Sequence, residues 1–326
     1  MIEFLVGSLY GERLELNLLF DKIMKENQSL FNKDYKISAL YGSFENSIWN
    51  GGRANKPFDI SFNDIKNNID LINQNGISVR YTFTNSLIKS NHLNDQASNK
   101  LMELANNGMN GAILASEDLY NYLKEKYPNF HYVYSTTNCS LNIEDYNKAY
   151  DKYDTLVLDQ RLNKNIDFLK KLKGKEKIEI LINHFCPINC PNIKKHYLSY
   201  SIYNLYNVKE KYNCLLKKDT LEVINYLKEK NIDTKLIDYY LFLKALIKNN
   251  ESLITREELK WYINNGFNKF KISSRHIAYE CIILIYVYYF SKEGCSDKIF
   301  DILKNTKFGK YSEFVRKDYF DVIKNG

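Results

Sequence analysis

The chain has 326 residues, of which 44% are hydrophobic, 26% charged and 14% aromatic, and its formal net charge is +7. With 13 glycines and 4 prolines, the composition excludes collagen-like and linker-rich disordered chains. No run of about 18 apolar residues occurs, so we expect no membrane-spanning helix and no membrane partner. The N-terminus lacks a basic segment and a small-residue cleavage site, so we interpret it as a strand and expect a cytoplasmic protein.

The positive charge comes mainly from lysine, because only seven of the 46 basic residues are arginine. Lysine alternates with acidic residues on expected helix faces, as between Lys170 and Glu176, which is typical of a solvated surface. A net charge of this kind mainly affects solubility and non-specific attraction to oppositely charged molecules. It does not by itself indicate nucleic-acid binding.

Short apolar runs rich in β-branched residues alternate with helical patterns along the chain. The expected strands are Ile2–Leu9, Ile37–Ser43, Ser78–Thr84, Gly111–Ala115, His131–Thr136, Thr155–Asp159, Lys177–Asn183 and Phe270–Ser273. The helices expected after them are Glu12–Glu26, Asn63–Gln74, Asn99–Asn106, one capped by Ser116 that ends before Pro128, Ile143–Tyr150, Asn165–Leu172, Arg256–Asn265 and His276–Ser291. Two further helical patterns, Leu221–Lys230 and Leu236–Ile247, interrupt the alternation.

Eight strands alternating with helices predict an α/β fold, a closed (β/α)8 TIM-like barrel with a helical insertion after strand 7. An open doubly wound sheet shares the alternation and is the alternative. We expect the barrel over residues 1–292, a helical insertion or cap over 194–254, and a C-terminal helical tail over 293–326. The insertion is expected to cover the mouth of the barrel and could bind a partner protein.

Polar side chains gather where the expected strands end, and in a barrel this end carries the active site. The candidates for substrate binding are Tyr41, Ser43, Asn50, Arg53, Thr84, Asn85 and Asn183, and those for catalysis are His184, Arg275 and Asp159. His184 could act as a general acid or base, or hold a neighbouring group. Arg275 could pair with a substrate carboxylate or with Asp159. Arg53, beside two glycines, could bind an anion or lie in a surface turn.

The sharpest feature is a pair of cysteines directly after strand 7. Cys186 and Cys190 lie four residues apart, and each is followed by a proline. Prolines stiffen a loop, and thiolates are ligands of zinc and of iron–sulfur clusters, so this loop is a candidate metal site. Cys214 could fold back as a third ligand, and Cys139, at the end of strand 5, could be the fourth. Two unrelated buried thiols are the alternative.

The segment from Glu179 to Pro191, followed by His196 and Tyr197, resembles the cysteine loop of the U32 "peptidase" family and its relatives. The stretch from Gly266 to Arg275 is similar to a later segment of that family, with Ser274 in place of its glycine. This resemblance implies a TIM-like barrel. It also implies, for several members, a four-cysteine [4Fe–4S] cluster and oxygen-independent hydroxylation of RNA or quinone precursors.

On this basis we expect an iron–sulfur enzyme acting by redox or hydroxylation chemistry on an RNA or a small molecule. Carried over from the family, the cluster ligands would be Cys186, Cys190 and Cys214, with Cys139 to be tested as the fourth. A zinc-dependent or metal-free hydrolase is the first alternative. A non-enzymatic binding protein with a structural metal site is the second.

Overall fold

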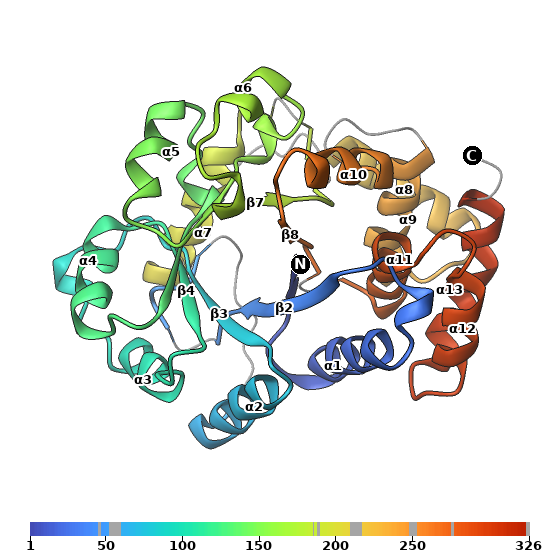
Figure 1. The fold of residues 1–326 in the computed structure, drawn as a ribbon, viewed down its shortest axis with the longest axis horizontal. Coiled ribbons are helices and arrows are strands. Elements are labelled where there is room, and N and C mark those ends of the chain that lie inside the picture. Colours follow the sequence, from blue (N-terminus) through green and yellow to red (C-terminus); the bar gives the residue numbers. More distant parts are fainter. Residues whose placement is uncertain are drawn as a thin grey trace.

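A computed structural model describes residues 1–44, 47–51, 60–184, 186–187, 190–208, 217–247, 253–274 and 277–323. Its centre is a closed barrel of eight parallel strands in sequence order (Figure 1). The strands are β1 (Ile2–Gly7), β2 (Tyr35–Gly42), β3 (Ser78–Phe83), β4 (Gly111–Leu114), β5 (His131–Tyr134), β6 (Thr155–Val157), β7 (Ile178–Leu181) and β8 (Lys269–Lys271). Pairing of Glu3 in β1 with Lys269 in β8 closes the sheet, which confirms the barrel and excludes the open sheet.

Helices surround this barrel. The barrel helices are α1 (Gly11–Glu26), α2 (Phe62–Gln74), α3 (Gln96–Leu104), α4 (Glu117–Lys126), α5 (Ile143–Tyr150), α6 (Ile166–Lys171), α10 (Arg256–Asn264) and α11 (Tyr279–Phe290). Between β7 and α10 lie α7 (Ile193–Tyr206), α8 (Lys217–Glu229) and α9 (Ile237–Ile247), and after α11 come α12 (Ser296–Lys304) and α13 (Gly309–Ile323).

The ends of several helices follow from local sequence. The Ser116 side chain accepts the backbone N–H of Leu119 and so caps α4, as its sequence predicts. Thr255 and Glu258 form a reciprocal capping box at the start of α10. Gly266, which follows this helix, has a φ of +92°, a conformation that glycine adopts without steric cost.

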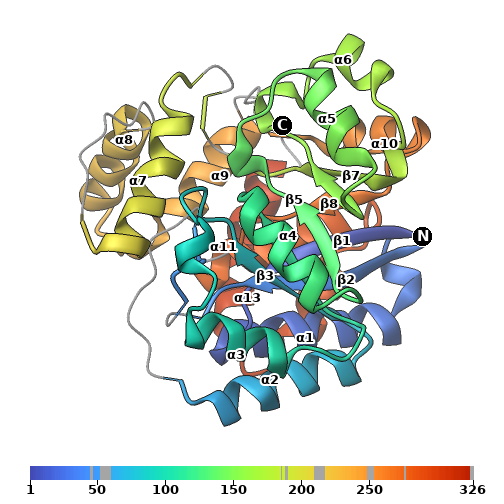
Figure 2. The same ribbon diagram turned by 90° about the vertical axis from the view of Figure 1, so that its left-hand side faces the viewer.

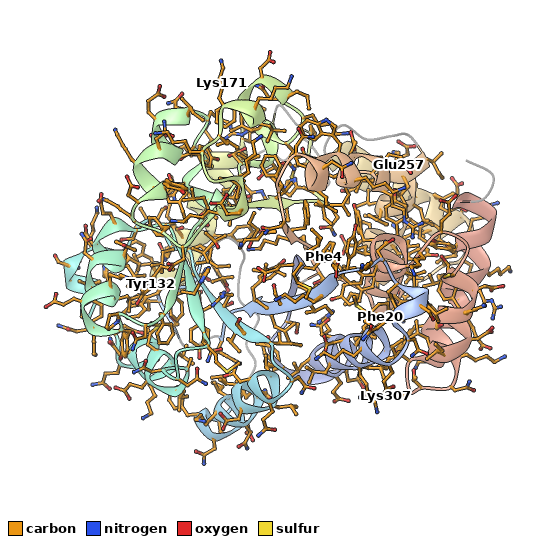
Figure 3. The ribbon with its side chains drawn as sticks, viewed as in Figure 1. Phe4, Phe20, Tyr132, Lys171, Glu257 and Lys307 are labelled. Carbon is orange, nitrogen blue, oxygen red and sulfur yellow. The ribbon has the colours of Figure 1, made fainter. Side chains whose placement is uncertain are left out.

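Aromatic side chains fill the layer between the sheet and the helices. Phe4 of β1 contacts Phe290 of α11, with ring centroids 4.7 Å apart, and Phe20 of α1 packs against Tyr286 at 5.1 Å. Figure 3 shows Phe4 and Phe20 in the interior and Lys171 on the rim of the molecule.

The most apolar stretch of the sequence is the buried helix α11. All of its residues from Glu280 to Phe290 are buried, and it packs against α9 and α13 as well as the barrel. An apolar surface on all sides is expected of a helix enclosed in this way. None of the described helices is long and apolar enough to span a membrane.

The three inserted helices do not form one cap. Helix α7 lies beyond the carboxyl ends of the strands, on the side opposite the N-terminus in Figure 2. Helix α9 instead joins the main core, where Tyr239 and Phe242 are fully buried. The Tyr239 hydroxyl lies 3.2 Å from the carboxylate of Asp318 in α13. The part of the insertion that reaches the barrel mouth is therefore α7, a helix that the sequence analysis did not predict.

Candidate functional site

Helix α7 is held over the carboxyl ends of β2 and β3 by hydrogen bonds to the backbone. The side-chain amide of Asn85 donates to the carbonyls of Ile48 and Ser201, both at 3.1 Å. Asn204 donates to the carbonyl of Asn50 at 3.1 Å. These contacts place one face of α7 at the mouth of the barrel.

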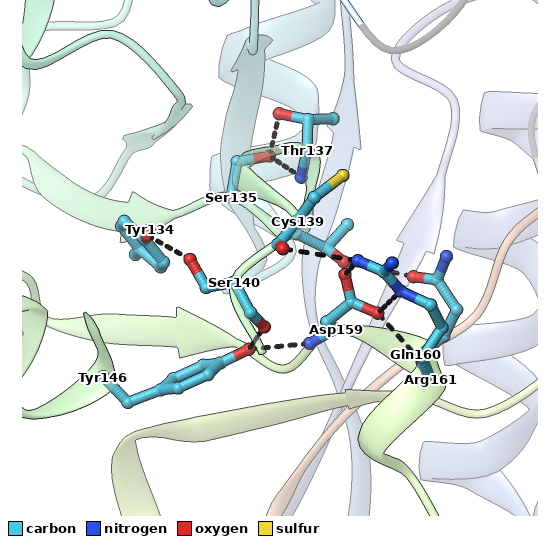
Figure 4. Close-up of polar contacts among 10 residues, drawn as sticks. Tyr134, Ser135, Thr137, Cys139, Ser140, Tyr146, Asp159, Gln160 and Arg161 are labelled. Carbon is cyan, nitrogen blue, oxygen red and sulfur yellow. Dashed lines mark hydrogen bonds and ion pairs between the residues drawn. The ribbon is translucent and has the colours of Figure 1, made fainter. Parts of the chain in front are cut away.

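A buried ion pair lies at the end of β6 (Figure 4). The carboxylate of Asp159 is fully buried and accepts hydrogen bonds from Nε and Nη2 of Arg161, both at 2.8 Å. Arg161 Nη2 also lies 3.3 Å from the carbonyl of Cys139, so the pair ties the end of β6 to the end of β5. Bidentate pairing uses both carboxylate oxygens, which suits Asp159 to positioning Arg161.

Tyr146 of α5 holds the backbone at Asp159, and so positions the Asp159–Arg161 pair. Its hydroxyl accepts the backbone N–H of Asp159 at 2.9 Å and donates to the carbonyl of Ser140 at 3.2 Å. The Ser140 hydroxyl lies 2.7 Å from that of Tyr134. The loops after β5 and β6 are thus locked together.

Tyr197 brings α7 into this cluster. Its hydroxyl lies close enough to Cys139, Cys186 and Asp159 for these groups to raise its pKa, although burial is the larger cause. Thiols from two separate loops therefore act electrostatically on one phenol at the barrel mouth.

Gln160 lies beside the same phenol and lowers its pKa. Its side chain is buried, and its Oε1 accepts the Thr136 hydroxyl at 3.1 Å. Its Nε2 has no hydrogen-bond partner of acceptable geometry among the described residues. A buried amide beside a phenol can help to orient a ligand oxygen.

The Cys139 thiol is held in its protonated form. Burial, and then the charge of Asp159, raise its pKa to about 11, while Arg161 and Lys194 act in the opposite direction. Its backbone has a φ of 54°, and its N–H donates to the carbonyl of Thr136 at 2.9 Å. A metal that binds this sulfur must displace the thiol proton.

The loop after β7 is tightly turned. The backbone N–H of Cys190 donates to the carbonyl of Pro187 at 3.0 Å, and that of Cys186 donates to Nδ1 of His184 at 3.3 Å. Cys190 is buried and Cys186 half-buried. Because Nδ1 of His184 accepts a backbone proton, the proton of a neutral His184 lies on Nε2.

The predicted ligand set is present only in part. Cys139, Cys186 and Cys190 are not in disulfide bonds, and Cys214 lies outside the described residues. Within the described ranges, no three side chains of His, Cys, Asp or Glu converge as a metal site. The cysteines supply sulfur ligands that suit zinc or an iron–sulfur cluster. The described residues do not, however, provide a complete set of ligands.

Several residues predicted to bind substrate have structural partners. The Tyr41 hydroxyl donates to the carbonyl of Ile272 at 2.8 Å, and the Asn50 amide donates to that of Phe44 at 2.6 Å. Asn183 exchanges two hydrogen bonds with the backbone of Ser273, at 2.7 and 3.0 Å.

Of the other predicted residues, the structure describes some and leaves two undescribed. Thr84 and Asn85 are buried at the end of β3, and Ser43 is half-buried after β2. Arg53 and Arg275 lie outside the described residues. Gln160 and Arg161 were not among the predicted residues, although both directly follow Asp159 at a strand end.

Neither a family model nor a curated protein matches the chain significantly. Among solved structures, that of the U32 peptidase Mk0906 is similar, with a TM-score of 0.51 over 84% of this chain and 93% of that one. Only 13% of the aligned residues are identical. The likeness is one of fold. It agrees with the family resemblance of the cysteine loop, and it shows no cofactor or activity for this chain.

Proposed function

We propose that this protein is a U32-like barrel enzyme whose chemistry takes place among the thiols at the carboxyl mouth of the barrel. The proposed cofactor is an iron–sulfur cluster, and the proposed reactions are redox or oxygen-independent hydroxylation of an RNA or a small molecule. One observation carries the proposal. Cys139 and Cys186, from two different loops, both act electrostatically on the hydroxyl of Tyr197 in helix α7.

The surroundings of these thiols are suited to a bound group. Arg161 and Lys194 bring positive charge to Cys139 and so offset part of the effect of burial and of Asp159, which raise the pKa of this thiol. An iron–sulfur cluster held by cysteine thiolates supplies electron transfer. Tyr197 and Gln160 present a hydroxyl and an amide beside the thiols, where they could orient a substrate oxygen.

Hydrolysis is the second candidate, because the similar solved structure is named a peptidase. The described residues favour it less. The Asp159 carboxylate is engaged by Arg161, and Nδ1 of His184 accepts a backbone N–H. In the described part of the mouth, these two residues are not arranged as the base and orienting carboxylate of a nucleophile triad.

Anaerobic purification, with and without reconstitution by iron and sulfide, tests the proposal. We expect iron and sulfide in the protein and absorbance near 400 nm, both lost when Cys139, Cys186 or Cys190 is replaced by alanine. Stoichiometric zinc without iron would select a zinc enzyme. A metal-free protein that cleaves a casein substrate would select hydrolysis.

A further inference from the structure

Asparagine directly precedes glycine at six places in the sequence, with the asparagines at positions 50, 75, 107, 110, 265 and 325. The backbone nitrogen that follows an asparagine can attack the side-chain amide carbon, which releases ammonia and leaves a cyclic imide. Glycine hinders this attack least, because it has no Cβ. The pairs at 50–51 and 110–111 are buried, and the pair at 325–326 lies outside the described residues.

The three remaining pairs are closely matched. The pairs at 75–76, 107–108 and 265–266 lie in the turns after helices α2, α3 and α10. Their glycines have φ values of +75°, +80° and +92°. In each pair the asparagine Nδ2 donates a hydrogen bond of 2.7 to 2.8 Å. The glycine conformation and the bonding of the amide nitrogen therefore do not distinguish them.

The pairs differ at the glycine nitrogen that attacks. The N–H of Gly76 donates to the carbonyl of Asn73 at 2.9 Å, and that of Gly266 donates to the carbonyl of Ile263 at 3.1 Å. The N–H of Gly108 has no acceptor among the described residues, and both residues of its pair are exposed. A nitrogen engaged by a carbonyl must be released before it can attack, so Gly108 offers the most available nucleophile of the three.

The side-chain oxygen of Asn107 is held between two donors. Its Oδ1 accepts the backbone N–H of Met109 at 3.1 Å and Nδ2 of Asn110 at 2.9 Å. The described residues donate no hydrogen bond to Oδ1 of Asn75 or Asn265. Negative charge develops on this oxygen when a nitrogen attacks the amide carbon, and donors already in place stabilise that charge.

We propose that Asn107 is a site of spontaneous modification, at which the amide becomes aspartate or isoaspartate with water as the only co-reactant. The nitrogen of Gly108 loses its proton and bonds to Cγ of Asn107. The bond from Cγ to Nδ2 breaks, and Nδ2 takes up one proton and leaves as ammonia. Water then adds to either carbonyl of the imide and opens the ring. This turn lies at the amino ends of the strands, opposite the mouth, so the proposal goes beyond the proposed function.

The modification would alter a hydrogen-bond network that supports β3. Nδ2 of Asn107 and Nδ2 of Asn110 both donate to Oδ1 of Asn73, at 2.7 and 3.0 Å. Oδ1 of Asn110 in turn accepts the backbone N–H of Val79 in β3 at 2.8 Å. A carboxylate at position 107 has no N–H for Asn73 and brings negative charge to its oxygen. We therefore expect the amide of Val79 to exchange faster after the modification.

The test is incubation of the full chain in mildly alkaline buffer, with conversion of each asparagine followed by peptide mass spectrometry. Breaking a hydrogen bond of average strength reduces the open population about fivefold, so we expect Asn107 to react at least that much faster than Asn75 and Asn265. In concentrated urea the three should react at similar rates. Equal or faster conversion of Asn75 or Asn265 in the folded protein, or the same ratio of rates in urea, would overturn the proposal.

Two variants test the expected effect on β3. Asn107→Asp carries the charge of the product, whereas Asn107→Gln keeps a neutral amide and is the matched control. We expect the amide of Val79 to exchange faster in Asn107→Asp than in Asn107→Gln. Equal exchange in the two variants would exclude this effect, and the rates in the unaltered protein decide separately whether Asn107 is the site.

Discussion

Asp159 and Arg161, two residues apart after β6, form a bidentate pair with both hydrogen bonds at 2.8 Å and the carboxylate fully buried. The pair holds the ends of β5 and β6 together, because Arg161 also donates to the carbonyl of Cys139. The geometry makes Asp159 a positioning residue at the mouth.

Asp159→Ala therefore tests a structural role. Removing the carboxylate leaves the Arg161 guanidinium without its partner, and we expect the free energy of unfolding to fall by about 3 kcal/mol. Denaturant unfolding measures this change. The Asp159→Ala, Arg161→Ala double variant should lose less than the sum of the single variants. Loss of activity with unchanged stability would contradict the structural role.

The rate at which Cys139 is alkylated should depend on pH as its buried, acidic surroundings predict. Burial and Asp159 raise the pKa of this thiol to about 11, so it is almost wholly protonated at neutral pH. Because the thiolate is the nucleophile, alkylation of Cys139 by iodoacetamide should rise about tenfold per pH unit from pH 7 to pH 10. Mass spectrometry of the metal-free protein gives the rate, with the half-buried Cys295 as an internal comparison. A rate that levels off near pH 8 would disagree with this environment.

His131, at the start of β5, should make the fold sensitive to acid. Burial, and then the charges of Arg80, Lys269 and Lys177, lower its pKa from 6.5 to about 3. Between these values the unfolded chain binds the proton and the folded chain does not. Stability is therefore complete above pH 6.5 and falls as the pH drops toward 3, by at most roughly 1.4 kcal/mol per pH unit.

The contribution of His131 can be separated from that of carboxylates by substitution. His131→Gln keeps a polar group near the Thr155 hydroxyl, which lies 2.9 Å from Nε2 of His131. Urea unfolding of both proteins from pH 4 to pH 7 should show a shallower pH dependence in the variant. Equal slopes would mean that His131 does not carry this effect.

Asn85 should control how firmly α7 is held over the barrel mouth. Asn85→Ala removes the hydrogen bonds to Ser201 and Ile48, so we expect faster amide hydrogen exchange in α7. Asn99→Ala is a suitable control, because Asn99 bonds to the carbonyls of Leu93 and Asp95. Unchanged exchange in α7 would show that other contacts hold the helix.

Much of the fold could be predicted from the sequence, because strand and helix patterns alternate clearly. The alternation indicated all eight strands, and the cap at Ser116 marked the start of α4. Helix α7 was missed because its polar and apolar side chains do not separate onto two faces. It is nevertheless the helix that reaches the site.

The contacts within the site were harder to predict. Arg161 could have been found, because an arginine two residues after a strand-end aspartate can fold back onto it. Tyr197 could not have been paired with Cys139 or Asp159 from the sequence, because that contact depends on how α7 packs.

The most direct test of the proposed function is the iron content per chain, measured after anaerobic reconstitution, in the unaltered protein and in two matched variants. Cys186→Ala removes a thiol near Tyr197, whereas Cys295→Ala removes one at the start of α12. We predict that the unaltered protein and Cys295→Ala retain iron and sulfide with absorbance near 400 nm, and that Cys186→Ala loses them. Equal iron content in both variants, or no iron in any of the three proteins, would contradict a cluster at the barrel mouth.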